Sequence, residues 1–398
     1  MPQCVRGRGR DARVRNLHFG DIPRKPVHDS TTVLINSHVH AHTYAHATHV
    51  HIHAHNTHTH THTHTHTHTH TTGNPCDTLR QCATNTHTHA HTHARARAHT
   101  HTHSGEANPA MPCVNMLLGA VRTAGMVLTV SPRYAREVMS DPLKGCELET
   151  ALKQVTVHGI LNGVEDVVRP DNAVLGLTET YDADSLDKKK QVKAAMQSSL
   201  GLMVDPDTPV FLFMGRLDVQ KGVDIMFEAI GRALDAGLKA QFITMGSGLE
   251  PLEEKATSLE DRFPGNFRAI LSFKGAEKYR TFAAADFALM PSRYEPCGLV
   301  QMEGMRFGTL PIVAPTGGLS DTVFDMQTGI VMPKEVQQDS VVTEGDVSML
   351  LDAISKACNL FRDEPTYRRM QRAAMGAAAA FSWSNSAKEY IAKFQSMW

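Results

Sequence analysis

The stretch Met290-Pro-Ser-Arg-Tyr-Glu-Pro-Cys-Gly-Leu-Val-Gln-Met-Glu-Gly-Met-Arg-Phe-Gly-Thr-Leu-Pro-Ile-Val-Ala-Pro-Thr-Gly-Gly-Leu319 decides the fold of this chain. Two apolar runs, residues 287–291 and 311–315, are long enough for strands buried in a core. Between them, residues 298–307 carry apolar side chains at helical spacing. A threonine and two glycines at 316–318 then open another helix. We therefore expect strand, loop, helix, strand, glycine turn and helix, in this order.

The same alternation of strands and helices continues on the N-terminal side of this stretch. Continuously apolar runs such as Val210-Phe-Leu-Phe-Met214 are typical of parallel strands that are buried on both faces. Further strands are expected at 240–245 and 267–273, and helices at 224–234, 248–259 and 277–284. This pattern predicts an α/β protein with a parallel sheet. Right-handed crossovers favour a Rossmann-like, doubly wound lobe.

Four loops follow expected strands, and ligands of doubly wound sheets bind at this carboxyl edge. The loops are 215–222, 246–248, 292–298 and 316–318. We therefore expect all four to face one crevice. In the first loop, Arg216 offers a fork of donors and Lys221 a point charge, and both groups suit a phosphate.

Two glutamates and a glycine pair add to the chemistry of this crevice. Glu295 precedes a helix and Glu303 lies between one and two turns into it, so both can reach a ligand across the helix start. Carboxylates there accept hydrogen bonds from sugar hydroxyls. Gly317 and Gly318 present backbone N–H groups at a helix start, which suits a phosphate. Taken singly, these features are also typical of surface charges and ordinary turns.

Taken together, three ordered segments resemble the C-terminal half of starch and glycogen synthases. They are Arg-Tyr-Glu-Pro-Cys-Gly-Leu at 293–299, Gly-Thr-Leu-Pro-Ile-Val at 308–313 and Thr-Gly-Gly-Leu-Ser-Asp-Thr-Val at 316–323. These synthases are retaining glycosyltransferases of the two-lobed GT-B fold, family 5. Residues 129–138 resemble the family where its two lobes meet, and Gly-Cys-Glu-Leu at 145–148 resembles the granule-bound starch synthase branch in particular.

The resemblance implies a nucleoside diphosphate glucose donor, ADP-glucose or UDP-glucose, and an α-1,4-glucan acceptor. Arg216 and Lys221 match the family residues that hold the donor diphosphate. With the amides of Gly317 and Gly318, they would stabilise the charge on the departing diphosphate. Glu295 would lie beside the glucose hydroxyls, and Glu303 would bind the ribose.

The rest of the expected donor site comes from the ends of the same strands. Gly215, Thr316 and Leu319 lie in the matching motifs. Phe273, at the end of an expected strand, is preferred over Tyr279 for stacking on the nucleobase, and Cys297 lies near the donor. No cofactor and no metal site are expected, because protein cations would meet the diphosphate.

Composition restricts the class of partners. A net charge of −1 gives no reason to expect nucleic acid. No run of 18 or more apolar residues indicates a membrane span. The seven cysteines form no disulfide framework, which fits a reducing compartment. With the resemblance, this predicts a plastid enzyme in a photosynthetic eukaryote and a cytoplasmic one elsewhere.

The N-terminal region has a different composition. All of the 25 histidines except His158 lie before residue 104, mostly alternating with threonine or alanine. With few large apolar residues, such a tract is expected to be disordered. Three origins are open. The tract is repeat DNA drawn into a gene model, a translated but inert tail, or a metal-binding tract. The first is considered because a (CA)n repeat encodes alternating His and Thr.

We therefore expect three parts: the low-complexity region 1–110, a hinge or interlobe segment 111–170 and the nucleotide-sugar-binding lobe 171–398. The resemblance covers about 112 to 398. The Lys-x-Gly-Gly-Leu motif and catalytic histidine of the family's N-terminal lobe are not found in 1–110. Three functions follow: a glucan-elongating synthase seen as an incomplete chain, a non-catalytic donor-lobe relic that binds nucleotide sugar or glucan, or a GT-B enzyme with a small-molecule acceptor.

Overall fold

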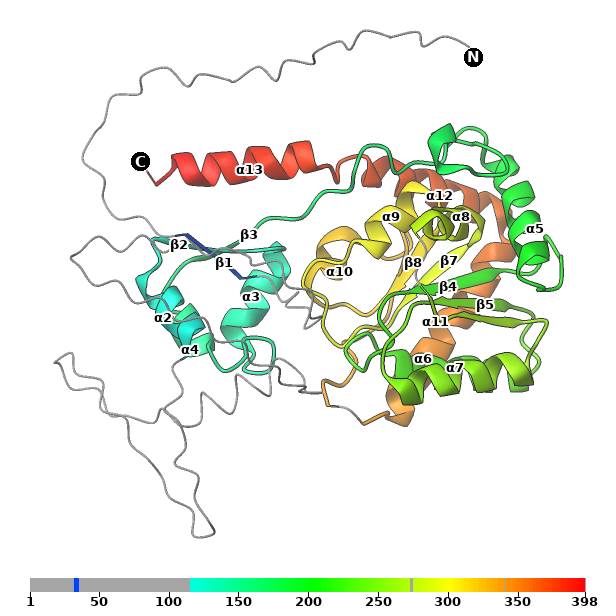
Figure 1. The fold of residues 1–398 in the computed structure, drawn as a ribbon, viewed down its shortest axis with the longest axis horizontal. Helices are drawn as coiled ribbons and strands as arrows, with labels where there is room; N and C mark the ends of the chain where they lie inside the picture. The colour runs from blue at the N-terminus through cyan, green and yellow to red at the C-terminus, as the bar shows by residue number, and fades with distance from the viewer. Residues whose placement is uncertain (1–31, 36–114, 273–274, 340, 398) are drawn as a thin grey trace, which may run out of the picture.

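The computed structural model describes residues 32–35, 115–272, 275–339 and 341–397. Over these residues the chain forms a small lobe and a large lobe, each built on a parallel sheet (Figure 1). Most of the expected low-complexity region lies outside the described residues. Its described part is strand β1 (Thr32–Ile35), which pairs with a strand of the small lobe.

The small lobe is a three-stranded parallel sheet packed against short helices. Its sheet order is β1-β2-β3, so the middle strand is β2. The elements are α2 (Met116–Thr123), β2 (Met126–Thr129), α3 (Pro132–Ser140), α4 (Glu149–Leu152) and β3 (Val157–Gly159). Buried Val127, Tyr134 and Leu152 belong to its core. The part of the chain assigned to the interlobe segment thus contains a packed unit with its own core.

The large lobe has the expected doubly wound topology. Its six parallel strands lie in the order β6-β5-β4-β7-β8-β9. They are β4 (Val210–Met214), β5 (Gln241–Met245), β6 (Phe267–Ile270), β7 (Phe287–Met290), β8 (Leu310–Val313) and β9 (Ile330–Val331). The chain runs outward from β4 to β6, then returns to the other side of β4 with β7. The switch point, where such sheets bind ligands, therefore lies between β4 and β7.

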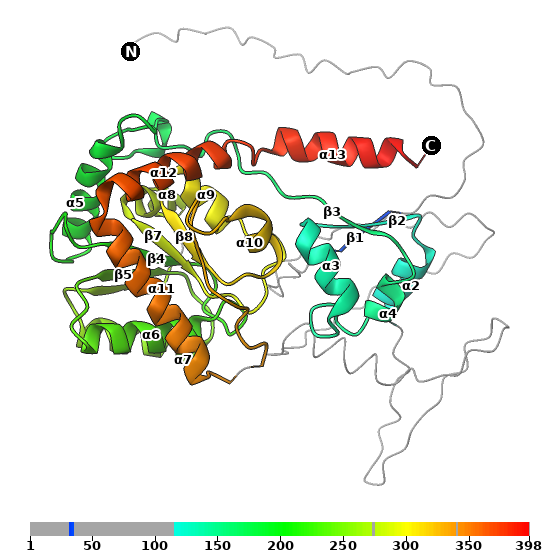
Figure 2. The same cartoon turned by 180° about the vertical axis from the view of Figure 1, so that it is seen from behind.

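Helices cover both faces of this sheet (Figure 2). One face carries α6 (Val223–Asp235), α7 (Glu250–Arg262) and α11 (Glu344–Arg362), and the other carries α5 (Lys189–Ser199), α8 (Gly275–Ala284) and α9 (Val300–Arg306). The remaining helices are η1 (Ala173–Leu175), η2 (Leu186–Lys188), α10 (Gly317–Thr322), α12 (Glu364–Ala378) and α13 (Trp383–Gln395).

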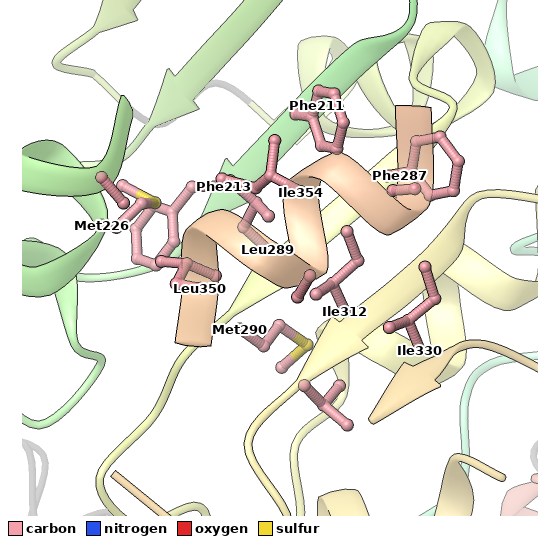
Figure 3. Close-up of a cluster of buried hydrophobic side chains, with 14 of the residues drawn as sticks. Phe211, Phe213, Met226, Phe287, Leu289, Met290, Ile312, Ile330, Leu350 and Ile354 are labelled. Carbon is pink, nitrogen blue, oxygen red and sulfur yellow. The ribbon is translucent and has the colours of Figure 1, made fainter. Parts of the chain in front are cut away.

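Alternation along β4 fills two separate cores. Phe211 and Phe213 point into the core that includes α6 and α11, whereas Leu212 points into the core that includes α5 and α8. Figure 3 shows the first core, where phenylalanines and aliphatic side chains of the strands lie against Leu350 and Ile354 of α11. Burying each such side chain contributes roughly 1.5–3 kcal/mol, which explains why the sequence shows continuous apolar runs here.

Helix α13 leads from the large lobe back to the small one (Figure 1). Tyr390 and Met397 pack against the small lobe's Met126, Leu128 and Ile160. Two apolar side chains of the helix are exposed: Ile391 is 55% exposed and Phe394 41% exposed. Part of the apolar surface of this last helix is therefore exposed.

Several boundaries differ from the predicted ones. The helix expected at 298–307 begins at Val300, because Gly298 has φ of 71° and cannot continue a right-handed helix. The strand expected to end at residue 273 ends at Ile270. Phe273 itself lies outside the described residues. Helices α11 and α12 and strand β9 were not predicted.

Candidate functional site

Lys221 and Glu295 meet at the switch point of the large sheet. Lys221 is in the loop after β4 and Glu295 is in the loop after β7, and Lys221 Nζ lies 2.5 Å from Glu295 Oε2. The glutamate side chain is 1% exposed and the lysine 17%. A backbone hydrogen bond of 2.9 Å from Arg293 N to Gln220 O joins the two loops. The fold thus brings together two of the three predicted catalytic residues.

Glu295 has one oxygen free for a ligand. Its Oε1 atom is buried and has no hydrogen-bond partner among the described residues. Leaving a buried polar atom unpaired costs on the order of 1–3 kcal/mol. A hydroxyl group that enters the crevice would satisfy this oxygen. The geometry therefore fits the predicted contact between Glu295 and a sugar.

Arg216, the third predicted catalytic residue, lies in the loop after β4 and is partly exposed. Its side chain is 46% exposed, and its Nη1 lies 2.8 Å from Asp218 Oδ2. Its Nη2 donates to Gln220 Oε1 at 3.0 Å. These contacts hold the guanidinium on the same loop as Lys221. The loop begins at Gly215, whose N–H donates to Met245 O at 3.0 Å and so extends the pairing of β4 with β5.

The glycine pair allows the glutamate loop to pack directly on the start of α10. Gly317 has φ of 45°, and a Cβ atom there would lie 2.0 Å from Glu295 O. A Cβ atom on Gly318 would lie 2.1 Å from Cys297 O. Gly318 N donates to Glu295 O at 2.9 Å. The glycines therefore position Glu295 through backbone contact, a role that the turn motif alone does not reveal.

Both amides predicted to bind phosphate already have acceptors. Gly318 N is bonded to Glu295 O as described above, and Gly317 N donates to Glu137 Oε1 of α3 at 3.0 Å. Thr316 is fully buried, and its Oγ1 accepts from Lys144 Nζ at 3.1 Å. A phosphate could reach the Gly317 amide only by replacing Glu137, so the predicted role requires a rearrangement.

Glu303 forms a second ion pair, with a lysine that the sequence analysis missed. Lys278 Nζ of α8 lies 2.7 Å from Glu303 Oε1, and the glutamate side chain is 9% exposed. Burial raises the pKa of Glu303, and the ammonium of Lys278 opposes that shift. The next residue, Tyr279, stacks on Phe307 with ring centroids 6.2 Å apart.

Leu319 and Cys297, two further residues of the predicted donor set, are also buried. Leu319 is 0% exposed and belongs to the hydrophobic core beneath α10, so its side chain stabilises the fold and does not line the crevice. Cys297 is 5% exposed, and desolvation raises the pKa of its thiol to about 12. The thiol is therefore protonated near neutral pH and a poor nucleophile.

The small lobe contributes residues for which the sequence analysis gave no role at the site. Ser131 Oγ donates to Pro296 O at 2.5 Å, next to Glu295. Arg133 N donates to Asp321 Oδ2 of α10 at 2.7 Å. The available signal was that residues 129–138 resemble a family segment where two lobes meet. That resemblance located the interface but did not say which side chains cross it.

Within the described part of the chain, no group of three or more His, Cys, Asp or Glu residues is placed to hold a metal ion. Of the helices described, none is long and apolar enough to cross a bilayer.

Two protein-family models match the chain. The model described as "Starch synthase catalytic domain" matches residues 26–154, and "Glycosyl transferases group 1" matches residues 202–357. Granule-bound starch synthase 1 of Arabidopsis thaliana is 39% identical over 249 residues, 62% of this chain and 40% of the relative. A glycogen synthase of Thioalkalivibrio sulfidiphilus is 35% identical over 283 residues, 70% of this chain and 57% of the relative.

The chain is homologous to the starch and glycogen synthases. Among solved structures, the catalytic domain of Starch Synthase IV from Arabidopsis thaliana, bound to ADP and acarbose, is similar at 30% identity and a TM-score of 0.64. The match covers 72% of this chain and 59% of that one. The predicted resemblance to starch and glycogen synthases and the predicted α/β fold are thereby confirmed.

The comparisons also correct the extent of the similarity. The chain spans about half the length of the curated synthases that it matches. The starch synthase match begins at residue 26, upstream of residue 112 where the sequence analysis placed it. Strand β1 explains the difference, because it pairs with β2 although the His-Thr tract separates them in sequence.

Proposed function

We propose that this protein transfers glucose from ADP-glucose or UDP-glucose to the end of an α-1,4-glucan with retention of configuration. The observation that carries the proposal is the Lys221–Glu295 pair, 2.5 Å apart at the switch point between β4 and β7. Sequence similarity to starch and glycogen synthases supports the substrate class. The chloroplastic name of the plant relative supports a plastid location, and the ADP bound to the similar Starch Synthase IV structure favours ADP-glucose.

The chemistry follows from the charges at the crevice. Cleavage of the bond between the anomeric carbon and the diphosphate leaves negative charge on the departing group. Lys221 and Arg216 are in place before the reaction begins and would stabilise that charge as it develops. Such preorganised electrostatic stabilisation is usually the largest single contribution to catalysis. Glu295 would hold the glucose through its free Oε1 atom, while its ion pair keeps the Lys221 ammonium at the crevice.

Substitution of the central pair tests the proposal. The full chain is incubated with radiolabelled ADP-glucose or UDP-glucose and a linear maltooligosaccharide, and labelled glucan is counted. Lys221→Met and Glu295→Gln are each expected to slow transfer roughly 10²-fold or more. Lys356→Met is the matched control, because Lys356 forms a surface ion pair with Asp325 at 3.4 Å. Near-normal transfer by either central variant would refute the assigned roles.

The alternative is a donor-binding protein without transferase activity. Its support is that the chain spans only about half the length of its relatives. Binding of the nucleotide sugar by calorimetry without labelled glucan would favour this alternative, whereas glucan synthesis by the purified chain would exclude it. Transfer to a small alcohol or phenol, but not to maltooligosaccharide, would indicate a different acceptor class.

A further inference from the structure

A polar cluster joins the two lobes beside the glycine turn. We call it the interlobe cluster and define it as Glu137, Lys144, Thr316, Gly317 and Glu335. Glu137 Oε1 accepts from Gly317 N at 3.0 Å, and its Oε2 lies 3.2 Å from Lys144 Nζ. The side chains of Glu137 and Lys144 are 8% and 2% exposed. An acidic side chain thus lies buried on an amide that the turn motif assigns to a phosphate.

The charges in this cluster allow Glu137 to leave Gly317. Glu137 is also paired with Arg133, whose Nε lies 3.1 Å from Oε1. Lys144 has two partners besides Glu137, since its Nζ lies 2.8 Å from Glu335 Oε2 and 3.1 Å from Thr316 Oγ1. After displacement, Glu137 would keep two cationic partners. Only the hydrogen bond to Gly317, and a weak contact of 3.5 Å to Thr316, would be given up.

We propose that Glu137 is an internal anion that occupies the phosphate position at Gly317 and that binding of a nucleoside diphosphate displaces it. An amide has one hydrogen and makes one strong hydrogen bond at a time, so carboxylate and phosphate compete for it. The inference rests on the proposed function, because it assumes that the donor's diphosphate reaches this turn.

The competition couples the donor to the small lobe. Glu137 is on α3, and Arg133 N of the same helix donates to Asp321 of α10 at 2.7 Å. When the donor takes the Gly317 amide, α3 loses a buried contact with the large lobe. Lys144 stays beside Thr316, where its ammonium can face the incoming phosphate. Glu137 therefore lowers donor affinity in the free protein and links donor binding to the contact between lobes.

Calorimetric titration of the full chain with ADP tests this inference. Glu137→Gln keeps the side-chain size and removes the charge. It is expected to bind ADP about tenfold tighter than the wild type, since hydrogen bonds to charged groups contribute on this order. Glu228→Gln is the control, because Glu228 pairs with Arg232 and Lys255 on the surface. Its affinity should equal that of the wild type. Equal or weaker ADP binding by Glu137→Gln would overturn the inference.

Hydrogen exchange of the unmodified protein gives a second test that does not depend on a variant. Saturating ADP is expected to speed amide exchange in residues 131–140, because α3 loses the Glu137 hydrogen bond to Gly317 of α10. Unchanged or slower exchange there would contradict the inference. If ADP binds but Glu137→Gln does not bind it more tightly and exchange in residues 131–140 does not speed up, the proposed donor site stands and only the role of Glu137 is refuted. Absence of ADP binding by wild type and variant alike would remove both.

Discussion

At the scale of single residues, the glycine turn shows how close packing and chemistry depend on the same atoms. Gly317 and Gly318 lie so near the backbone of the Glu295 loop that a Cβ atom on either would overlap a carbonyl oxygen. Their conformation holds Glu295 on Lys221. The same turn leaves Gly317 N on Glu137 rather than free. In this structure, the glycines of a motif that resembles a phosphate site therefore serve mainly to allow close packing of the Glu295 loop on α10.

Gly317→Ala is expected to destabilise the protein strongly. The substitution combines φ of 45° with a Cβ position 2.0 Å from Glu295 O, so we expect a loss of about 3 kcal/mol in the free energy of unfolding. Urea unfolding measures it. Gly237→Ala is the control, because Gly237 has φ of 76° but no atom within 4 Å of its Cβ position. It should lose only about 1–2 kcal/mol. Similar losses for both variants would show that the overlap has little effect.

At the scale of secondary-structure elements, helix α3 packs in the core of the small lobe and also contacts the large lobe at its N-terminal end. Ser131 caps it by accepting from Tyr134 N at 3.2 Å, and Pro132 follows at the first helical position. The same hydroxyl donates to Pro296 O at 2.5 Å, in the glutamate loop. The start of one helix thus satisfies a backbone carbonyl of the other lobe, next to the candidate site.

Ser131→Ala is expected to cost more than an ordinary helix cap. Loss of a cap costs about 1 kcal/mol, and an unpaired buried carbonyl at Pro296 adds about 1–2 kcal/mol. Ser382→Ala is the matched variant, because Ser382 caps α13 by accepting from Asn385 N at 3.2 Å and gives the cap term alone. Thermal and urea unfolding of both variants measure the difference. Equal losses would mean that the Pro296 contact contributes nothing.

At the scale of the whole molecule, one buried lysine connects α5 by hydrogen bonds to the C-terminal ends of two other helices. Lys189 Nζ lies 2.9 Å from Ala283 O at α8 and 3.0 Å from Phe307 O at the end of α9. Burial lowers the pKa of Lys189 to about 7, and the charge of Asp286 opposes that shift. The lysine therefore binds its proton less tightly in the folded protein than in the unfolded chain.

This shift predicts that the protein becomes more stable as the pH rises from 7 to 9. In that window the unfolded chain holds a proton on Lys189 that the folded protein has largely lost, so the free energy of unfolding increases. The slope from this group approaches about 1.4 kcal/mol per pH unit. Lys189→Met should flatten this part of the profile in urea unfolding. Lys190→Met, at an exposed lysine paired with Glu364, should retain it. A wild-type profile without this rise would contradict the shift.

Much of the fold and part of the site follow from local sequence. Apolar runs and helical spacing predicted the strands β4 to β8, and the loops after them predicted that Lys221 and Glu295 would face one crevice, but not that they would form an ion pair. Helices α11 and α12 were missed although they are long. Phe273 lies outside the described residues, so its predicted stacking role stays a prediction. Leu319 was assigned to the ligand, but it belongs to the core, because a motif match does not show which way a side chain points.

The sequence by itself determined the α/β class, the loops at the carboxyl edge and the family, because periodicity and motifs are properties of neighbouring residues. The tertiary structure alone decided which groups oppose one another across the lobes. Glu137 and Gly317 are 180 residues apart, and only the packing of α3 on α10 brings the carboxylate to the amide. Such a contact depends on the relative placement of two sheets, and no local spacing in the chain encodes it.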